Sequence, residues 1–242
     1  MSDSKVLKYI SRLQSQALET HTNCRPVLLV TDSKGYQLQS AGSKESCIQI
    51  QYITKAGASA DNTEIFQSLF DNLATISHTD KPIVFIWLGT CDLTKKRGRF
   101  LYIKNNLPSR ISILSALYST IKAEIIAKRP GCTVLFLPCP DLSIVEWNKS
   151  KGHDNPELFL GDQLLLQQHI RLLNDAFATL NSSSKLFAPG LNHDLIRSTK
   201  RSKDTKYKLN FNLLRDGVHP KHNLALLWLL RIQDCVRRIA DN

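Results

Sequence analysis

The sequence predicts a three-layer α/β/α domain, in which helices cover both faces of a parallel β-sheet. Short continuous apolar runs alternate with longer segments whose apolar residues recur every three or four positions. The first pattern is typical of strands buried on both faces, and the second of amphipathic helices. No fixed-period repeat divides the 242 residues. We therefore expect one unit, with a packing helix in residues 1–25 and the main domain in residues 26–242.

Five apolar runs are candidates for the strands. Each is too short for a buried helix, and the first follows the turn signal Arg25-Pro26. The runs cover residues 27–30, 48–53, 83–88, 133–137 and, less clearly, 185–188. Residues 36–46 show no clear periodicity, so this connection is expected to be a loop or a short helix, with no assignment between the two.

Five segments have the spacing of amphipathic helices. Asp61 and Glu64 resemble a capping box ahead of the second, while Pro108 and Pro130-Gly131 bound the third. The apolar stripes are Val6, Ile10, Leu13 and Ala17; Ile65, Leu69 and Leu73; Ile111, Leu114, Tyr118, Ile121 and Ile125; Leu166, Ile170, Leu173, Phe177 and Leu180; and Ala225, Leu229, Ile232, Val236 and Ile239.

The chain is basic, with 32 Lys and Arg against 21 Asp and Glu and a net charge of +11. The positive electrostatic field of such a chain attracts polyanions and anionic membrane surfaces non-specifically. Residues 147–156 and 197–208 are expected to be surface excursions, and the second holds the densest basic cluster. This cluster either flanks the functional cleft and binds a polyanion or is a solvated loop. Its candidate polyanion-binding residues are Arg197, Lys200, Arg201, Lys203, Lys206 and Lys208.

The sequence shows neither an export signal nor a membrane-spanning segment. Its first 20 residues are polar, and no apolar run approaches the ~20 residues that a spanning helix needs. We expect a soluble intracellular protein, cytoplasmic or nuclear. The cysteines form no CxxC pair or zinc-type spacing, so reduced thiols and no metal site are predicted. They are residues 24, 47, 91, 132, 139 and 235.

Candidate functional residues follow the predicted strands, because ligands of parallel sheets bind at the carboxyl ends of the strands. Asp32-Ser33 follows the first run, Gly57 the second and Gly89-Thr90-Cys91-Asp92 the third. A serine there can present its hydroxyl and backbone N–H to a ligand, and a glycine permits close backbone approach. Each segment alone is equally typical of an ordinary turn.

Asp216 and His219 are the most informative pair, and they precede the last predicted helix. In a turn, the carboxylate can bind one imidazole nitrogen while the other faces a serine. Pro220 keeps His219 out of the helical region. In isolation, the pair is also compatible with an aspartate that caps a turn beside a surface histidine.

These four segments, in this order, resemble the signature blocks of the SGNH (GDSL-type) hydrolase superfamily over residues 26–240. Thr31 stands where the family's Gly-Asp-Ser block begins with glycine. The remaining matches are Gly57 with the second-block glycine, Gly89 to Asp92 with Gly-x-Asn-Asp, and Asp216-x-x-His219 with the last block.

The resemblance implies a flavodoxin-like fold with a five-stranded parallel sheet and no metal or organic cofactor. It also implies that Ser33 is the nucleophile, that His219 is the general base and acid, and that Asp216 orients the imidazole. The oxyanion hole would comprise Ser33, Gly57 and position 91. Cys91 replaces the family's asparagine there, and a thiol is a weak hydrogen-bond donor.

Two functions remain open at this stage. The leading hypothesis is a serine esterase that cleaves an acetyl or lipid ester through an acyl-enzyme. The alternative is a catalytically weakened SGNH-fold module that binds nucleic acid or another polyanion, since similar domains occur in proteins of LINE-type mobile elements. Lys34 is expected to be solvated or to contact an anionic substrate group, and Trp87 to pack in the core.

Overall fold

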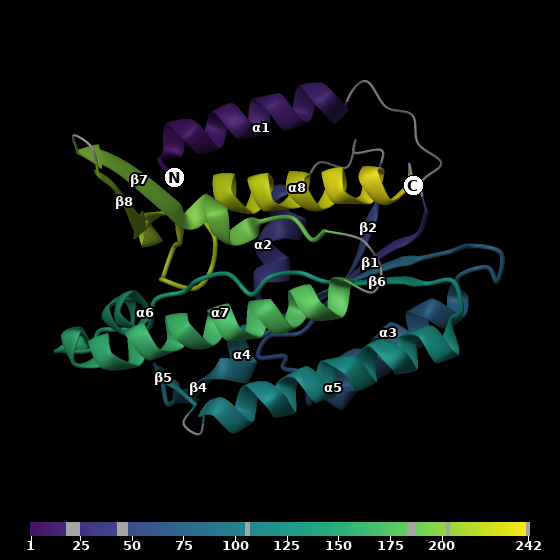
Figure 1. Ribbon diagram of the computed structural model, residues 1–242, viewed down its shortest axis with the longest axis horizontal. Coiled ribbons are helices and arrows are strands. Elements are labelled where there is room, and N and C mark those ends of the chain that lie inside the picture. The colour runs from purple at the N-terminus through teal and green to yellow at the C-terminus, as the bar shows by residue number, and fades with distance from the viewer. Residues whose placement is uncertain (18–24, 43–47, 105–106, 183–186, 202–203, 241–242) are drawn as a thin grey trace.

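A parallel sheet of four strands, in the order β2-β1-β3-β6, lies at the centre of the molecule (Figure 1). The computed structural model describes residues 1–17, 25–42, 48–104, 107–182, 187–201 and 204–240. The strands of the sheet are β1 (Val27–Thr31), β2 (Ile50–Thr54), β3 (Ile83–Trp87) and β6 (Thr133–Phe136). β1 pairs with β2 on one side and β3 on the other, so the first apolar run is an inner strand.

The expected fifth strand is absent from the described part of the chain. Residues 185 and 186 of that run lie outside the described residues, and Phe187 and Ala188 belong to no strand. Phe187 is 84% exposed, so this apolar residue is not held in the sheet.

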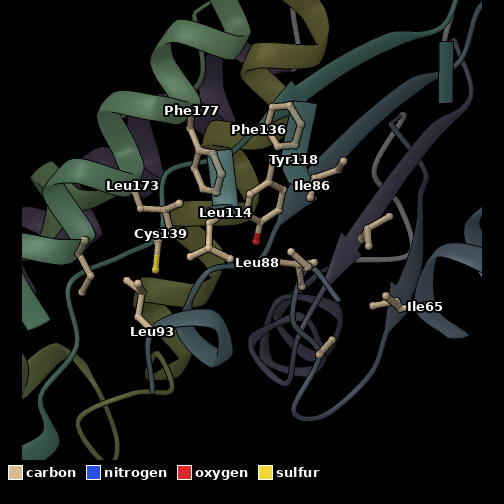
Figure 2. Packing of buried hydrophobic residues seen from close by; sticks show 14 of the residues in the cluster. Ile65, Ile86, Leu88, Leu93, Leu114, Tyr118, Phe136, Cys139, Leu173 and Phe177 are labelled. Atoms are coloured by element: carbon tan, nitrogen blue, oxygen red, sulfur yellow. The ribbon is translucent and has the colours of Figure 1, made fainter. Parts of the chain in front are cut away.

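The strands send alternate side chains into two apolar cores. Leu28 and Val84, at even positions, pack beneath α3, α5 and α7, whereas Leu29 and Phe85, at odd positions, pack beneath α2 and α8. Figure 2 shows part of the first core, where Tyr118 lies among side chains from neighbouring elements. The predicted three-layer α/β/α arrangement is confirmed. These helices are α2 (Lys34–Ala41), α3 (Thr63–Thr75), α5 (Leu107–Lys128), α7 (Leu160–Ser182) and α8 (His222–Ala240).

Helix α1 (Asp3–Ala17) packs on the outer side of α8 (Figure 1). It buries Val6 and Ile10 in the second core. The amino group of Met1 donates to the Ile196 carbonyl at 2.6 Å, and Asn210 Nδ2 donates to the Met1 carbonyl at 2.7 Å. These two hydrogen bonds join residue 1 to the segment around Ile196 and Asn210, about 200 residues later in the chain.

Helix α2 occupies the connection that the sequence left open between a loop and a short helix. It carries no apolar stripe: Leu38 is its one buried apolar side chain, and its first turn also packs closely against the sheet at Gly35. A Cβ atom added to Gly35 would lie 2.2 Å from Thr31 Cγ2 and 2.7 Å from Thr54 Oγ1. Glycine therefore lets the first turn of α2 lie directly on β1 and β2.

Two local expectations from the sequence are wrong. Asn62, not Asp61, caps α3, and its side chain accepts from the Ile65 N–H at 3.0 Å. Residues 147–156 are not simply a surface excursion, because Trp147 belongs to α6 (Ile144–Ser150) and is only 5% exposed. Its indole Nε1 donates to the Arg99 carbonyl at 3.1 Å, which explains how this amphipathic ring is buried.

Two antiparallel hairpins extend from the sandwich, β4–β5 and β7–β8. The basic segment predicted as an excursion forms most of β7–β8. Arg197 and Lys208 face each other across this hairpin and are exposed, while Lys203 lies outside the described residues. The remaining elements are β4 (Thr94–Arg97), β5 (Phe100–Ile103), β7 (Ile196–Arg201), β8 (Asp204–Leu209), α4 (Thr90–Leu93), η1 (Pro156–Phe159), η2 (Leu191–Leu195) and η3 (Phe211–Leu213).

Among the described residues, no helix has the length and apolarity needed to cross a bilayer. In the same part of the chain, no group of three or more His, Cys, Asp or Glu side chains is arranged to hold a metal ion. Cys24 and Cys47 lie outside it, and the four described cysteines are free thiols: Cys91, Cys132, Cys139 and Cys235.

Candidate active site

A cavity of about 460 Å³ lies where the loops after β1, β2 and β3 meet the turn before α8. Ser33, Gly57, Cys91 and His219 all line it, although they come from four separate segments. The parallel sheet brings these segments to one edge because its strands all end there.

Ser33, His219 and Asp216 form a continuous hydrogen-bonded chain. Ser33 Oγ lies 2.9 Å from His219 Nε2, and His219 Nδ1 lies 2.8 Å from Asp216 Oδ2. Ionised Asp216 can only accept, so Nδ1 carries the ring proton and Nε2 of the neutral imidazole accepts from the serine hydroxyl. The site can therefore remove the serine proton without rearrangement.

The turn between Asp216 and His219 holds both side chains in place. Asp216 Oδ1 accepts from the backbone N–H groups of Val218 at 3.1 Å and His219 at 2.8 Å. Burial alone would raise the pKa of Asp216, but hydrogen bonds from the His219 ring and backbone bring it below its ordinary value. Asp216 therefore stays ionised beside the imidazole.

Gly217 makes this turn possible. Its φ of +84° lies in the left-handed region, and an added Cβ would be 2.6 Å from the Ser143 carbonyl and 2.8 Å from the Trp147 nitrogen. The Gly217 carbonyl in turn accepts from the Ser143 N–H at 2.7 Å. Only glycine allows the turn to lie this close to the start of α6.

Two backbone N–H groups are available for an oxyanion. Within the described part of the chain, neither Ser33 nor Gly57 uses its N–H in a hydrogen bond. Gly57 has a φ of +80° and open space at its Cβ position. The Cys91 side chain lines the same cavity, and burial raises its pKa to about 11. At neutral pH it is therefore a thiol, a weak donor rather than a nucleophilic thiolate.

Lys34 is buried, contrary to both expectations for it. Its side chain is 1% exposed, forms an ion pair with buried Asp32 and donates to Thr90 Oγ1 at 2.8 Å. Nζ also lies 5.3 Å from the centre of the Trp87 ring, which is packed in the core as predicted. The pair joins the loops after β1 and β3. The spacing of opposite charges in Asp32-x-Lys34 was the sequence signal for it.

Asp92 links the loops after β2 and β3 beneath the cavity. Its carboxylate accepts from the Ala60 N–H at 2.9 Å and the Tyr118 hydroxyl at 2.7 Å. Tyr118 reaches it from the apolar core shown in Figure 2. Burial raises the pKa of Asp92, although both hydrogen bonds oppose this shift. This carboxylate is a positioning group, and its tertiary partners were not evident from the sequence.

The other wall of the cavity comes from α6 and the β4–β5 hairpin, which the sequence did not mark as part of the site. The Trp147 ring lies 5.8 Å from the His219 ring, and Lys96 Nζ lies 4.8 Å from the centre of the indole. Lys95 and Lys104 also line this wall. Arg197 and Lys208, whose side chains the structure describes, do not line the cavity, and the expectation that the basic segment flanks the cleft stays a prediction.

Comparison with known proteins identifies the fold. No family model and no curated protein matches the sequence. A lipase/acylhydrolase from Enterococcus faecalis has a TM-score of 0.52 and 14% identity, with 90% of this chain and 96% of that chain covered. A member of the lipolytic G-D-S-L family from Veillonella parvula also has a TM-score of 0.52, with 12% identity and coverage of 86% and 96%. The chain has the SGNH (GDSL-type) hydrolase fold.

A further similar structure extends the match over nearly the whole chain. A protein from Streptococcus pneumoniae, named after platelet activating factor, has a TM-score of 0.52 and 17% identity and aligns with 97% of this chain and 95% of its own. The likeness thus includes the SGNH sheet together with the segments that surround the cavity. Sequence identities this low show the fold, and the chemistry rests on the side chains described above.

Proposed function

We propose that this SGNH-fold protein is a serine hydrolase that cleaves a carboxylic ester through an acyl-enzyme on Ser33. The observation that supports this most strongly is the Ser33–His219–Asp216 chain, with its contacts of 2.9 and 2.8 Å. Ester hydrolysis also agrees with the lipase and acylhydrolase names of proteins that share the fold.

In the proposed mechanism, His219 Nε2 takes the hydroxyl proton as Ser33 Oγ attacks the ester carbonyl. Asp216 stabilises the resulting imidazolium. The tetrahedral intermediate then collapses: the bond to the alcohol oxygen breaks and His219 gives that oxygen the proton. Water, activated by the same imidazole, hydrolyses the acyl-enzyme and regenerates Ser33.

The backbone N–H groups of Ser33 and Gly57 are the proposed main donors to the oxyanion. Cys91 adds a third, weaker donor, whereas an asparagine amide there would donate strongly. Loss of one good donor lowers turnover by about 10²–10³-fold, so this assignment predicts a slow esterase rather than an inactive protein.

The test is turnover of 4-nitrophenyl acetate by the purified full chain. Ser33→Ala and His219→Asn should each lower kcat by at least about 10³-fold, because members of a triad act as one unit. Ser15→Ala changes a serine of α1 whose hydroxyl binds the Arg12 carbonyl, so it is the matched control and should retain wild-type turnover. Equal turnover by the wild type and Ser33→Ala would overturn the proposal.

We also propose polyanion binding by the β7–β8 hairpin as a second candidate function. The register places Arg197 opposite Lys208 and Thr199 opposite Lys206, and the first two are exposed. Binding of a mixed-sequence oligonucleotide should weaken steeply with salt, because neutralised phosphates release counterions. Arg197→Ser with Lys208→Ser should weaken it further. Undetectable binding at low salt would refute this proposal.

A further inference from the structure

The wall of the cavity formed by the β4–β5 hairpin is basic. Lys95 and Lys96 come from β4, and Lys104 follows β5; all three line the cavity that holds Ser33. Lys104 Nζ donates to the Cys91 carbonyl at 2.7 Å. Within the described residues, none of the three lysines has a carboxylate within 4.0 Å.

The acidic groups near the cavity do not balance this charge. Asp32 already pairs with buried Lys34. Asp92 lies beneath the floor, where its carboxylate accepts from Ala60 and Tyr118. Asp61 is exposed and does not line the cavity; it accepts from the Ser59 hydroxyl at 2.5 Å, and besides this bond Lys104 helps to lower its pKa. Asp216 is ionised beside His219, and the Arg215 guanidinium lies 3.6 Å from its Oδ2. Lys95 and Lys96 therefore leave a local excess of positive charge.

The position of His219 shows which end of an ester this wall would meet. The group that protonates the departing alcohol oxygen must face the alcohol portion of the substrate. Trp147 lies next to the His219 ring, and Lys96 lies over the indole of Trp147. Through Trp147, Lys96 is therefore near the imidazole that would protonate the alcohol oxygen, and the cation–π contact holds the ammonium group on that indole.

We infer that the substrate is an ester whose alcohol portion carries an anionic group, such as a phosphate, sulfate or carboxylate, bound by Lys96. Lys95, its neighbour on β4, points to the other face of the hairpin and adds to the positive field. This inference rests on the proposed esterase function. The anion takes no part in the bond changes: the ester C–O bond breaks, the alcohol oxygen receives the proton from His219, and the charged group leaves with the alcohol. Because an ammonium group binds an anion as a point charge, the negative charge of the substrate group matters more than the shape of that group.

The test compares two aryl acetates that differ in one distal substituent. One is the acetate of 4-hydroxybenzenesulfonate, and the other is the acetate of the neutral N,N-dimethylsulfonamide analogue. Each kcat/KM is divided by the rate constant for hydroxide-catalysed hydrolysis of the same ester, which removes the difference in leaving-group reactivity. The wild type should prefer the sulfonate by roughly tenfold at low salt, and the preference should shrink as salt rises.

Substitutions then locate the source of the preference. Lys96→Gln and Lys95→Gln should each move the ratio toward one, Lys96→Arg should retain it, and Lys96→Glu should favour the neutral ester. Lys8→Gln removes one charge from an exposed position of α1 and should leave the ratio unchanged. Circular dichroism and urea unfolding confirm that each variant is folded.

The outcomes separate the two proposals. Equal normalised rates for the two esters, or a sulfonate preference that survives Lys95→Gln with Lys96→Gln, would overturn the anionic-substrate inference and leave the esterase proposal intact. Hydrolysis of neither ester above the level of Ser33→Ala would overturn the esterase proposal, and this inference with it.

Discussion

Gly217→Ala should damage both stability and turnover, because a single methyl group must enter the tightest turn of the site. The substitution leaves Asp216 and His219 chemically unchanged. Its Cβ would meet two backbone atoms, the Ser143 carbonyl at 2.6 Å and the Trp147 nitrogen at 2.8 Å. Neither atom can rotate away as a flexible side chain does, so the turn itself must move.

Gly131→Ala is a matched control for the energetic cost of placing a residue with a side chain in the left-handed backbone conformation. Gly131 has the same φ of +84°, but the nearest atom to its Cβ position is Lys81 Cγ at 3.6 Å, an ordinary contact. It lies between α5 and β6, at the amino end of that strand and away from the cavity. The left-handed conformation costs an L-residue about 1–2 kcal/mol, and both variants incur it. Forced overlap adds about 1–3 kcal/mol at Gly217 alone.

We therefore expect the free energy of unfolding to fall by about 1–2 kcal/mol in Gly131→Ala and about 2–5 kcal/mol in Gly217→Ala, measured by urea denaturation. The kcat/KM for 4-nitrophenyl acetate should fall by about 10²-fold in Gly217→Ala, since a shift of 1 Å can misplace a catalytic group. Gly131→Ala should keep its turnover. Equal destabilisation of the two variants, with turnover preserved in both, would refute this account of the turn.

Three further predictions concern buried groups of the site. Cys91→Asn should raise kcat by about tenfold and have no effect in a Ser33→Ala background; unchanged turnover would place residue 91 outside the oxyanion hole. With a pKa near 11, Cys91 is about one part in a thousand thiolate at pH 8. Its alkylation by iodoacetamide should therefore accelerate up to about pH 11, and a plateau near pH 8.5 would contradict the burial effect. Lys34→Met should lower the unfolding free energy by about 3–5 kcal/mol by leaving Asp32 unpaired, and adding Asp32→Asn should restore part of it; a loss below 1 kcal/mol would count against the buried pair.

The layered fold was predictable because its signals are local and repeated. β1 and β3 are continuous apolar runs, and the stripes of α3, α5, α7 and α8 recur at helical spacing. α2 gave no such signal, since its packing depends on the missing side chain of Gly35 against β1 and β2. The apolar run at 185–188 was misleading because Phe187 is exposed rather than paired in the sheet.

The residues with chemical function were only partly predictable. The order of the sequence blocks picked out Ser33, Asp216 and His219, and the structure places them within hydrogen-bonding distance. Lys34 looked like a surface lysine although its ion-pair partner Asp32 is only two residues away, because its burial also depends on contact with Thr90, 56 residues away. Trp147 lies in a polar segment, and its proximity to His219 depends on how α6 packs beside the turn before α8. Tertiary contacts of this kind leave no periodic trace in the sequence.

Labelling with a fluorophosphonate probe, followed by peptide mass spectrometry, tests the central claim most directly. The probe reacts with a serine whose hydroxyl has been activated by a neighbouring base, whatever the natural substrate. We predict one adduct, on Ser33, that is absent from Ser33→Ala and strongly reduced in His219→Asn. Unmodified Ser33 in the folded protein, or an adduct elsewhere that persists in Ser33→Ala, would contradict the claim that these residues form an active serine hydrolase site.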